Sequence, residues 1–173
     1  MPIVFSRIVL DMFLVIDDSD RKMMKFIGSI EAKADAKGRV FLPSVFRKAL
    51  QSLGDESLVL RPDVFQPCLV LYPESVWNAQ VDDLRSRLSR WNATHQRIFR
   101  QFVSDVELLS LDGSGRFLLP KRFMQMAGIE QSVSFLGMGD SIEIWSSGRM
   151  EQSLFDGDEY MSALQEIMGG GKE

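Results

Sequence analysis

A short motif occurs twice in this chain, and its duplication constrains the fold more than any other feature. Residues 35–43 (DAKGRVFLP) align with residues 112–120 (DGSGRFLLP) at a shift of 77, with Asp, Gly, Arg, Leu and Pro at equal spacing. Further on, residues 69–72 (LVLY) correspond to residues 142–145 (IEIW) at a shift of 73. Repetition at a fixed interval is typical of chains built from copies of one structural unit, so we expect two related units of about 50 residues.

Each copy predicts the same local structure. A strand (28–34 or 103–111) leads into an Asp-x-x-Gly-Arg turn, in which Gly38 or Gly115 stands where a positive φ is favoured. A short apolar strand follows, and Pro43 or Pro120 is then expected in the first turn of a short helix. Two more strands complete each unit, at residues 57–61 and 68–72 and at residues 133–136 and 141–145.

Helices are expected between and after the units. An amphipathic stripe (Trp77, Val81, Leu84, Leu88) and a second helix capped by Asn92 or Thr94 are predicted within residues 74–102. The predicted organisation is therefore an amino-terminal extension (1–22), a first unit (24–77), a helical linker (78–102), a second unit (103–150) and a carboxy-terminal helix and tail (151–173).

Residue composition excludes several classes of function. The chain has one cysteine, Cys68, and one histidine, His95. One thiol rules out an internal disulfide framework and a multi-thiolate zinc site, and one imidazole leaves little for metal binding or a catalytic triad. The apolar run at residues 3–16 is too short to span a membrane, and no signal-peptide cleavage site follows it. We expect a cytoplasmic protein with no enzymatic activity, metal or cofactor.

The net charge of the chain is the sum over basic and acidic segments that alternate along the sequence. The formal net charge is −4, but residues 21–50 carry eight basic and two acidic groups, and residues 84–125 carry eight and three. Affinity for a polyanion depends on the local basic face rather than on the net charge. The alternative explanation of these segments is that they are solvated helix faces.

Four stretches of sequence resemble the MraZ family of bacterial transcriptional regulators, which contain two SpoVT/AbrB-like domains. They are DAKGRVFLPSVFR (35–47), CLVLYPESVW (68–77), LDGSGRFLLP (111–120) and GDSIEIWSSGRME (139–151). The resemblance implies an α+β, mainly β fold: two tandem swapped-hairpin AbrB-like β-barrel units with pseudo-twofold symmetry, plus linker and C-terminal helices. It also implies a nucleoid-associated, ring-shaped homo-oligomer. This ring would act as a repressor on direct repeats of double-stranded DNA in the promoter of the division and cell-wall operon.

The duplicated turn also suggests how such a chain contacts DNA. An arginine directly after a glycine turn projects from a rigid point, and its planar guanidinium can chelate a phosphate or a guanine edge. The alternative is that each Asp–Arg pair only stabilises its turn. The expected DNA-binding residues are Lys37, Arg39 and Arg47 in the first unit and Arg116, Lys121 and Arg122 in the second; Asp35, Gly38, Asp112 and Gly115 are expected to form the turns.

The two units are not equivalent in charge. Ser114 replaces Lys37, and Met124 replaces Arg47. We therefore expect the first unit to carry most of the affinity for DNA. The competing hypothesis is a ring-forming scaffold or antitoxin-like module, in which the same arginines contact acidic protein surfaces without specific DNA binding.

Overall fold

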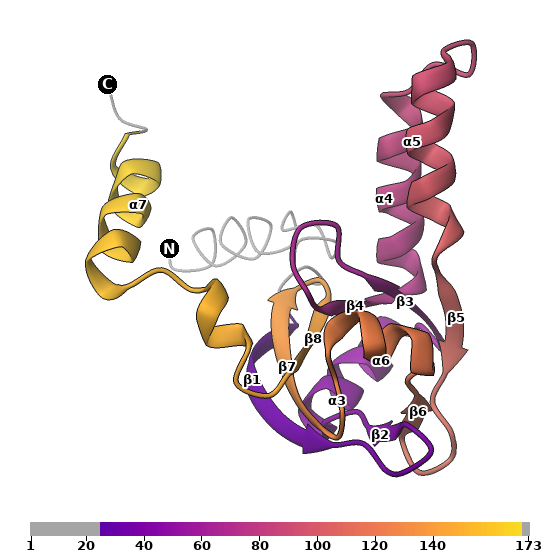
Figure 1. The fold of residues 1–173 in the computed structure, drawn as a ribbon, viewed down its shortest axis with the longest axis vertical. Helices are drawn as coiled ribbons and strands as arrows, with labels where there is room; N and C mark the ends of the chain where they lie inside the picture. The colour runs from indigo at the N-terminus through magenta and orange to yellow at the C-terminus, as the bar shows by residue number, and fades with distance from the viewer. Residues whose placement is uncertain (1–24, 171–173) are drawn as a thin grey trace, which may run out of the picture.

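Strands from both sequence units contribute to one antiparallel sheet. The computed structural model describes residues 25–170, and its six-stranded sheet has the order β1-β7-β8-β4-β3-β5 (Figure 1). The first unit supplies β1 (Phe26–Lys33), β3 (Ser57–Pro62) and β4 (Leu69–Pro73); the second supplies β5 (Glu107–Ser110), β7 (Ser132–Gly139) and β8 (Ile142–Ser146). Each unit's leading strand pairs with the other unit, β1 with β7 and β5 with β3. The fold is α+β, as expected.

A separate two-stranded ribbon joins the units a second time. It consists of β2 (Arg39–Phe41) and β6 (Arg116–Leu118), and it places Val40 opposite its own repeat equivalent, Phe117. In the large sheet, Val70 of β4 likewise lies opposite its equivalent, Glu143 of β8. Exchange of the two units therefore maps the strand order onto itself, which is a twofold relation at the level of topology.

The structure corrects the expectation of two β-barrel units. Within residues 25–170, no closed barrel forms, and the sheet is open with β1 and β5 at its edges. Size favours this arrangement, because a unit of about 50 residues buries only a marginal hydrophobic core by itself. Each unit instead completes its hydrophobic contacts with strands of the other.

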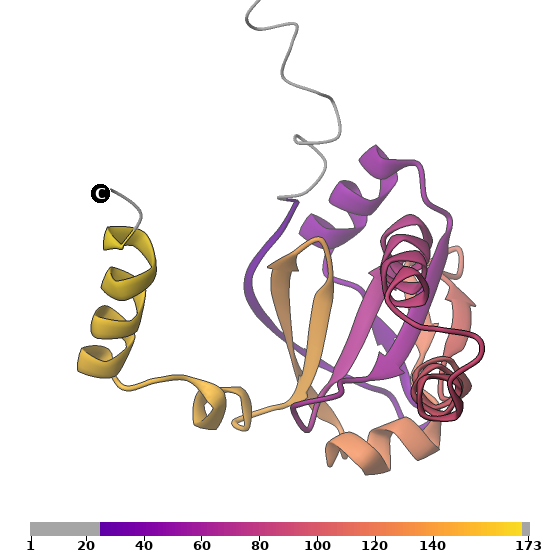
Figure 2. The same ribbon diagram turned by 90° about the horizontal axis from the view of Figure 1, so that it is seen from above.

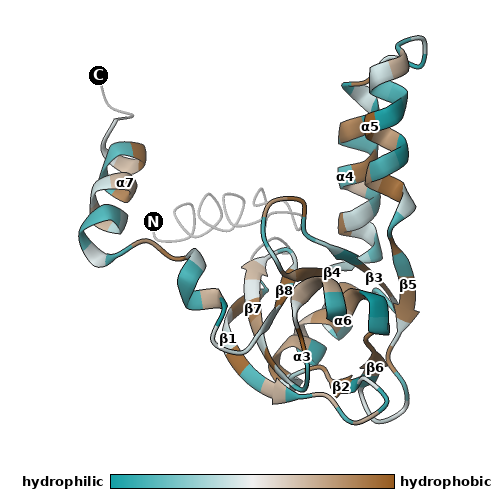
Figure 3. Cartoon of the chain, viewed as in Figure 1, coloured by the Kyte–Doolittle hydropathy of each residue, from teal (hydrophilic) through white to brown (hydrophobic). Residues whose placement is uncertain are grey.

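Two short helices pack against the hydrophobic core beside the ribbon. Helix α3 (Ser44–Leu53) buries Phe46 and Leu50, as the four-residue spacing predicts, and α6 (Lys121–Ala127) buries Phe123 and Ala127. These side chains pack with apolar residues of the strands, which are the brown segments in the sheet of Figure 3. The two prolines, Pro43 and Pro120, lie one position earlier than expected: they are extended N-caps rather than first-turn residues.

The linker is a helical hairpin that projects from the sheet (Figures 1 and 2). Helix α4 (Glu74–Ser86) and helix α5 (Ala93–Ser104) are joined by a short turn, and the Asn92 side chain caps α5 by accepting a hydrogen bond from the His95 backbone N–H at 3.1 Å. This confirms one of the two predicted caps. The strand predicted to begin at Val103 starts later, at Glu107, because α5 continues through Ser104.

The chain ends in an extended arm. After β8 come a single 3-10 turn (Met150–Ser153) and helix α7 (Gly157–Gly169), and Figures 1 and 2 both show α7 standing away from the sheet, on the opposite side from the α4–α5 hairpin. The amino-terminal extension, residues 1–22, lies outside the described residues.

Candidate nucleic-acid interface

The two repeated motifs form nearly identical turns. In the first, Gly38 N–H donates to the carbonyl of Asp35 at 2.9 Å, and Gly38 has φ +88°. In the second, Gly115 N–H donates to the carbonyl of Asp112 at 3.0 Å, and its φ is +84°. Side chains rarely adopt this left-handed backbone region, so each turn requires its glycine.

The aspartate of each turn holds both the backbone and the arginine that follows. Asp35 Oδ1 accepts from the backbone N–H groups of Lys37 (3.0 Å) and Arg39 (2.9 Å), and Oδ2 accepts from Arg39 Nε at 2.8 Å. Asp112 makes the same contacts with Ser114 and Arg116, with a distance of 2.9 Å to Arg116 Nε. These bonds, led by the one from the arginine backbone N–H, lower the pKa of both aspartates below 3.8.

Both arginines keep part of their donor capacity. The Arg39 side chain is 39% exposed and the Arg116 side chain 30%. Among residues 25–170, each is bonded through Nε only, so Nη1 and Nη2 have no protein hydrogen bond. The aspartate therefore fixes the plane of the guanidinium and leaves its outer edge able to bind a ligand.

The ribbon places both arginines on one face. Side chains alternate along β2 and β6: Val40 and Phe117 are buried, and their neighbours point outward. The register sets Arg39 opposite Leu118 and Arg116 opposite Phe41, so the arginines are diagonal neighbours. Phe41 and Leu118 are each 54% exposed. We call Arg39, Phe41, Arg116 and Leu118 the ribbon face.

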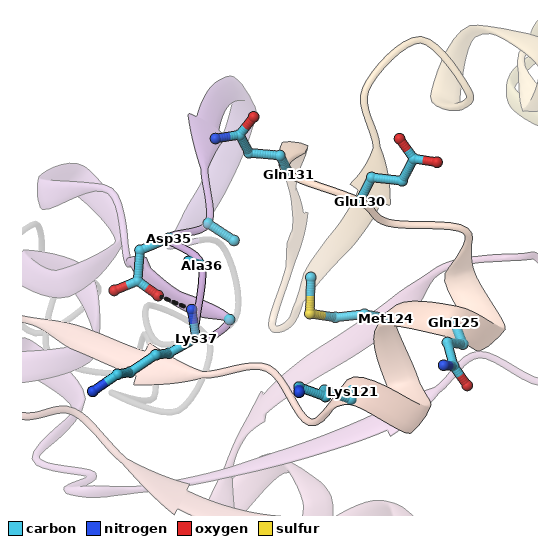
Figure 4. Close-up of a pocket in the computed structure, with 10 residues that line it drawn as sticks. Asp35, Ala36, Lys37, Lys121, Met124, Gln125, Glu130 and Gln131 are labelled. Atoms are coloured by element: carbon cyan, nitrogen blue, oxygen red, sulfur yellow. Dashed lines mark hydrogen bonds between the residues drawn. The ribbon is translucent and has the colours of Figure 1, made fainter.

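Two lysines flank this region across a groove of about 340 Å³ (Figure 4). Lys37 comes from the first turn and Lys121 from the start of α6, so the groove lies between the two sequence units. The walls also carry Asp35 and Glu130, which make the groove mixed in charge rather than purely basic.

Arg47 lies in a different setting from the other expected DNA-binding residues. It extends from α3 across the second turn, and its Nη1 donates to the Ser114 carbonyl at 3.2 Å. Its Nε is buried without a hydrogen-bond partner among the described residues. Arg47 is thus partly occupied in packing against the other unit.

Arg122 is already paired with two carboxylates. Its Nη1 donates to Asp105 and its Nη2 donates to Glu107 at 2.8 Å. Hydrogen bonding to these carboxylates, Glu107 first, raises the pKa of Arg122. Its charge is offset locally, and it connects α6 to the segment that leads into β5.

Phe41 and Leu118 are outward-facing residues of the site that the sequence did not predict. The two-residue period of β strands could have indicated this orientation. When an arginine faces outward and the next residue is buried, the residue after that lies on the same face as the arginine. The contact of Arg47 with the second turn had no indication in the sequence, because it joins residues 67 positions apart.

Between residues 25 and 170, no group of three His, Cys, Asp or Glu side chains is placed to hold a metal ion. In the same range, no helix has the length and apolar content needed to cross a lipid bilayer.

Comparison with known proteins gives one family. The family model described as "MraZ protein, putative antitoxin-like" matches residues 26–101 and 103–161. The "Transcriptional regulator MraZ" of Phocaeicola vulgatus is 57% identical over 146 residues, which is 84% of this chain and 95% of the relative. Proteins of the same name from Bacteroides fragilis (56% identical; 84% and 92% covered) and Pseudomonas syringae pv. syringae (34% identical; 81% and 90% covered) are also similar.

Proposed function

The chain belongs to the MraZ family, whose relatives are named transcriptional regulators, and on this premise we propose that it regulates transcription by binding specific double-stranded DNA through the ribbon face. In this proposal it acts as a repressor on direct repeats in the promoter of the division and cell-wall operon, in the cytoplasm at the nucleoid.

The observation that carries the proposal is the geometry of Arg39 and Arg116. Both lie on the outward side of a two-stranded ribbon, and both are held through Nε by an aspartate of the same turn. A two-stranded ribbon fits the major groove of B-DNA, where a bidentate arginine recognises guanine O6 and N7. A guanidinium already oriented by Asp35 or Asp112 loses less side-chain entropy on binding than a free one.

The remaining basic residues have unequal roles in this proposal. Lys37 and Lys121 are exposed beside the ribbon and contact phosphates, which positions the protein without selecting the sequence. Arg47 contributes mainly by supporting the second turn. Arg122 contributes least, because Asp105 and Glu107 offset its charge.

Assembly into a ring supplies the affinity that one ribbon lacks. A single ribbon face offers few contacts, but linked copies convert each later binding event into an intramolecular one. Head-to-tail rings present identical faces in the same direction, which suits direct repeats, whereas a twofold dimer suits palindromes.

Fluorescence anisotropy with duplex DNA from upstream of the chain's own gene tests the proposal, with a shuffled duplex of equal composition as the sequence control. We expect tight, sequence-dependent binding that weakens with salt, with a log–log slope of about 0.9 per phosphate contacted.

A matched variant pair tests the residue assignment. Arg39→Ala should reduce the preference for the upstream duplex. Arg87→Ala should not, although Arg87 forms a similar pair with Asp83 four residues away, on the linker hairpin. Equal affinity for both duplexes in the wild type, or no binding at low salt, would instead favour the scaffold or antitoxin-like module.

A further inference from the structure

The ribbon face contains two exposed apolar side chains beside its two arginines. Phe41 and Leu118 are each 54% exposed, whereas Val40 is 1% and Phe117 is 3% exposed. A single exposed apolar residue is common on a protein surface and needs no explanation. Here two of them make up half of the four-residue face, so a groove of DNA that receives the arginines also encloses Phe41 and Leu118.

The register of the ribbon arranges the four side chains as a compact square. Arg39 lies opposite Leu118, and Phe41 lies opposite Arg116. Directly opposite residues of an antiparallel pair have Cβ atoms about 4.5–5.5 Å apart, and alternate residues of one strand are about 7 Å apart. Since B-DNA rises about 3.4 Å per base pair, each arginine has an apolar side chain within about two base-pair steps.

Both apolar side chains are held in place by the rest of the ribbon. The guanidinium carbon of Arg116 lies 5.7 Å from the centre of the Phe41 ring, which is a cation–π distance. Leu118 packs over the first turn, where its Cδ1 would lie 3.7 Å from a Cβ at Gly38. Because these contacts already restrict the two side chains, little conformational entropy is lost when DNA encloses them.

The major groove of DNA presents one alkyl group, the C5-methyl of thymine. Most other positions on the base edges are hydrogen-bond donors and acceptors. An apolar side chain that covers a donor or acceptor removes its water and provides no bond in return, which disfavours binding. The same side chain against a thymine methyl buries apolar surface and leaves no polar group unpaired.

We infer that Phe41 and Leu118 determine sequence specificity by contacting thymine methyl groups, next to the guanines that Arg39 and Arg116 recognise. The DNA site of one chain then contains thymine within about two base pairs of guanine. The inference rests on the proposed function and deepens it, because it names a second base that the ribbon face selects.

Replacement of thymine by deoxyuridine tests this contact, because it removes the methyl group and keeps the base pairing and the O4 acceptor. Anisotropy titrations compare the upstream duplex with the same duplex in which every thymine is deoxyuridine. The wild type should bind the uracil duplex about fourfold more weakly for each methyl group buried. Phe41→Ala/Leu118→Ala should bind both duplexes equally, because the side chains that contact the methyl groups are absent.

The matched control is Ile27→Ala, which shortens an exposed apolar side chain (67%) on edge strand β1, outside the ribbon. This variant should keep the full difference between the two duplexes, and loss of the difference would count against the inference. Circular dichroism melts and gel filtration verify that each variant folds and assembles like the wild type. The wild-type comparison needs no variant, so it tests the inference even if a variant fails to fold.

Three further results would overturn the inference: equal binding of both duplexes by the wild type, a methyl dependence that persists in Phe41→Ala/Leu118→Ala, or a smaller assembly for that variant. The last result would place the two side chains between copies of the chain. The first two leave the proposed function intact if the wild type still prefers the upstream duplex to the shuffled one. Absence of that preference would refute the proposed function itself, so different pairs of duplexes separate the two failures.

Discussion

Arg47 and Gly115 are in direct contact although they belong to different sequence units. A methyl group added at Gly115 would overlap the Arg47 guanidinium, so the arginine packs directly over the glycine. The same contact recurs at the equivalent positions, where Met124 Sδ would lie 3.3 Å from a Cβ at Gly38. Each turn is thus covered by the helix of the other unit, and the ribbon face forms only when both units are folded together.

The two turn glycines should differ in their tolerance of alanine. Both have a positive φ, which costs an alanine about 1–2 kcal/mol. At Gly38 the new Cβ also meets the backbone oxygen of Leu119 at 2.8 Å, whereas at Gly115 it meets the flexible side chain of Arg47. We expect Gly38→Ala to lower the free energy of unfolding more than Gly115→Ala in urea denaturation.

A double variant checks this explanation. Removal of the Arg47 side chain should reduce the additional cost of Gly115→Ala, so the two changes together should destabilise less than their sum. Strict additivity would show that steric contact with Arg47 is not the cause.

DNA binding by the ribbon face should depend more on Arg39 than on Arg116. Arg39→Ala is expected to weaken binding of the upstream duplex about tenfold or more, since one bidentate base contact is worth about 1–3 kcal/mol. Arg116→Ala should have a smaller effect, because Ser114 provides no charge beside it and its guanidinium lies 5.7 Å from the Phe41 ring. A larger loss for Arg116→Ala would contradict this order. Anisotropy titrations at one salt concentration suffice.

Two adjacent residues of α6, Lys121 and Arg122, should contribute differently to DNA binding. Lys121→Ala should lower DNA affinity for all sequences and reduce the salt slope by about 0.9, as expected for one lost phosphate contact. Arg122→Ala should leave the salt slope unchanged and lower the stability only slightly, because its two ion pairs are solvent-exposed. A reduced slope for Arg122→Ala would assign it to the DNA contact.

Ionisation of the two turn carboxylates, Asp35 and Asp112, should make the stability of the protein depend on pH in the acidic range. The folded-state pKa of Asp35 and of Asp112 lies below the ordinary 3.8, so their ionised forms stabilise the fold at higher pH. That stabilisation is complete above about 3.8 and is lost as the pH falls through the lowered value. Thermal melts should therefore separate wild type from Asp35→Asn/Asp112→Asn at neutral pH, and the difference should shrink below pH 4. A difference that grows on acidification would be inconsistent with these pKa directions.

The single cysteine should report unfolding. Cys68 is 2% exposed, and burial raises the pKa of its thiol far above the ordinary value. Since the thiolate is the reactive form, iodoacetamide should label the native protein very slowly and the urea-unfolded protein rapidly. Fast labelling under native conditions would mean that the sheet around Cys68 opens readily.

Local structure followed from the sequence at most positions. The two glycine turns, the strands after them and the buried faces of α3 and α6 are set by short-range chemistry: a positive φ at Gly38 and Gly115, and a four-residue apolar spacing at Phe46 and Leu50. The α5 cap at Asn92 belongs to the same class, because it depends on residues three positions apart.

Pairing between the units was decided only by the tertiary structure. Propensity and period are the same whether β1 pairs within its unit or with β7, and only the shared hydrophobic core distinguishes the two arrangements. The contact of Arg47 with the second turn crosses between the units in the same way, and the ion pairs of Arg122 join residues 15 and 17 positions apart within the second unit. The sequence alone therefore determined which residues could carry charge to a ligand, and long-range packing determined which of them remain free to do so.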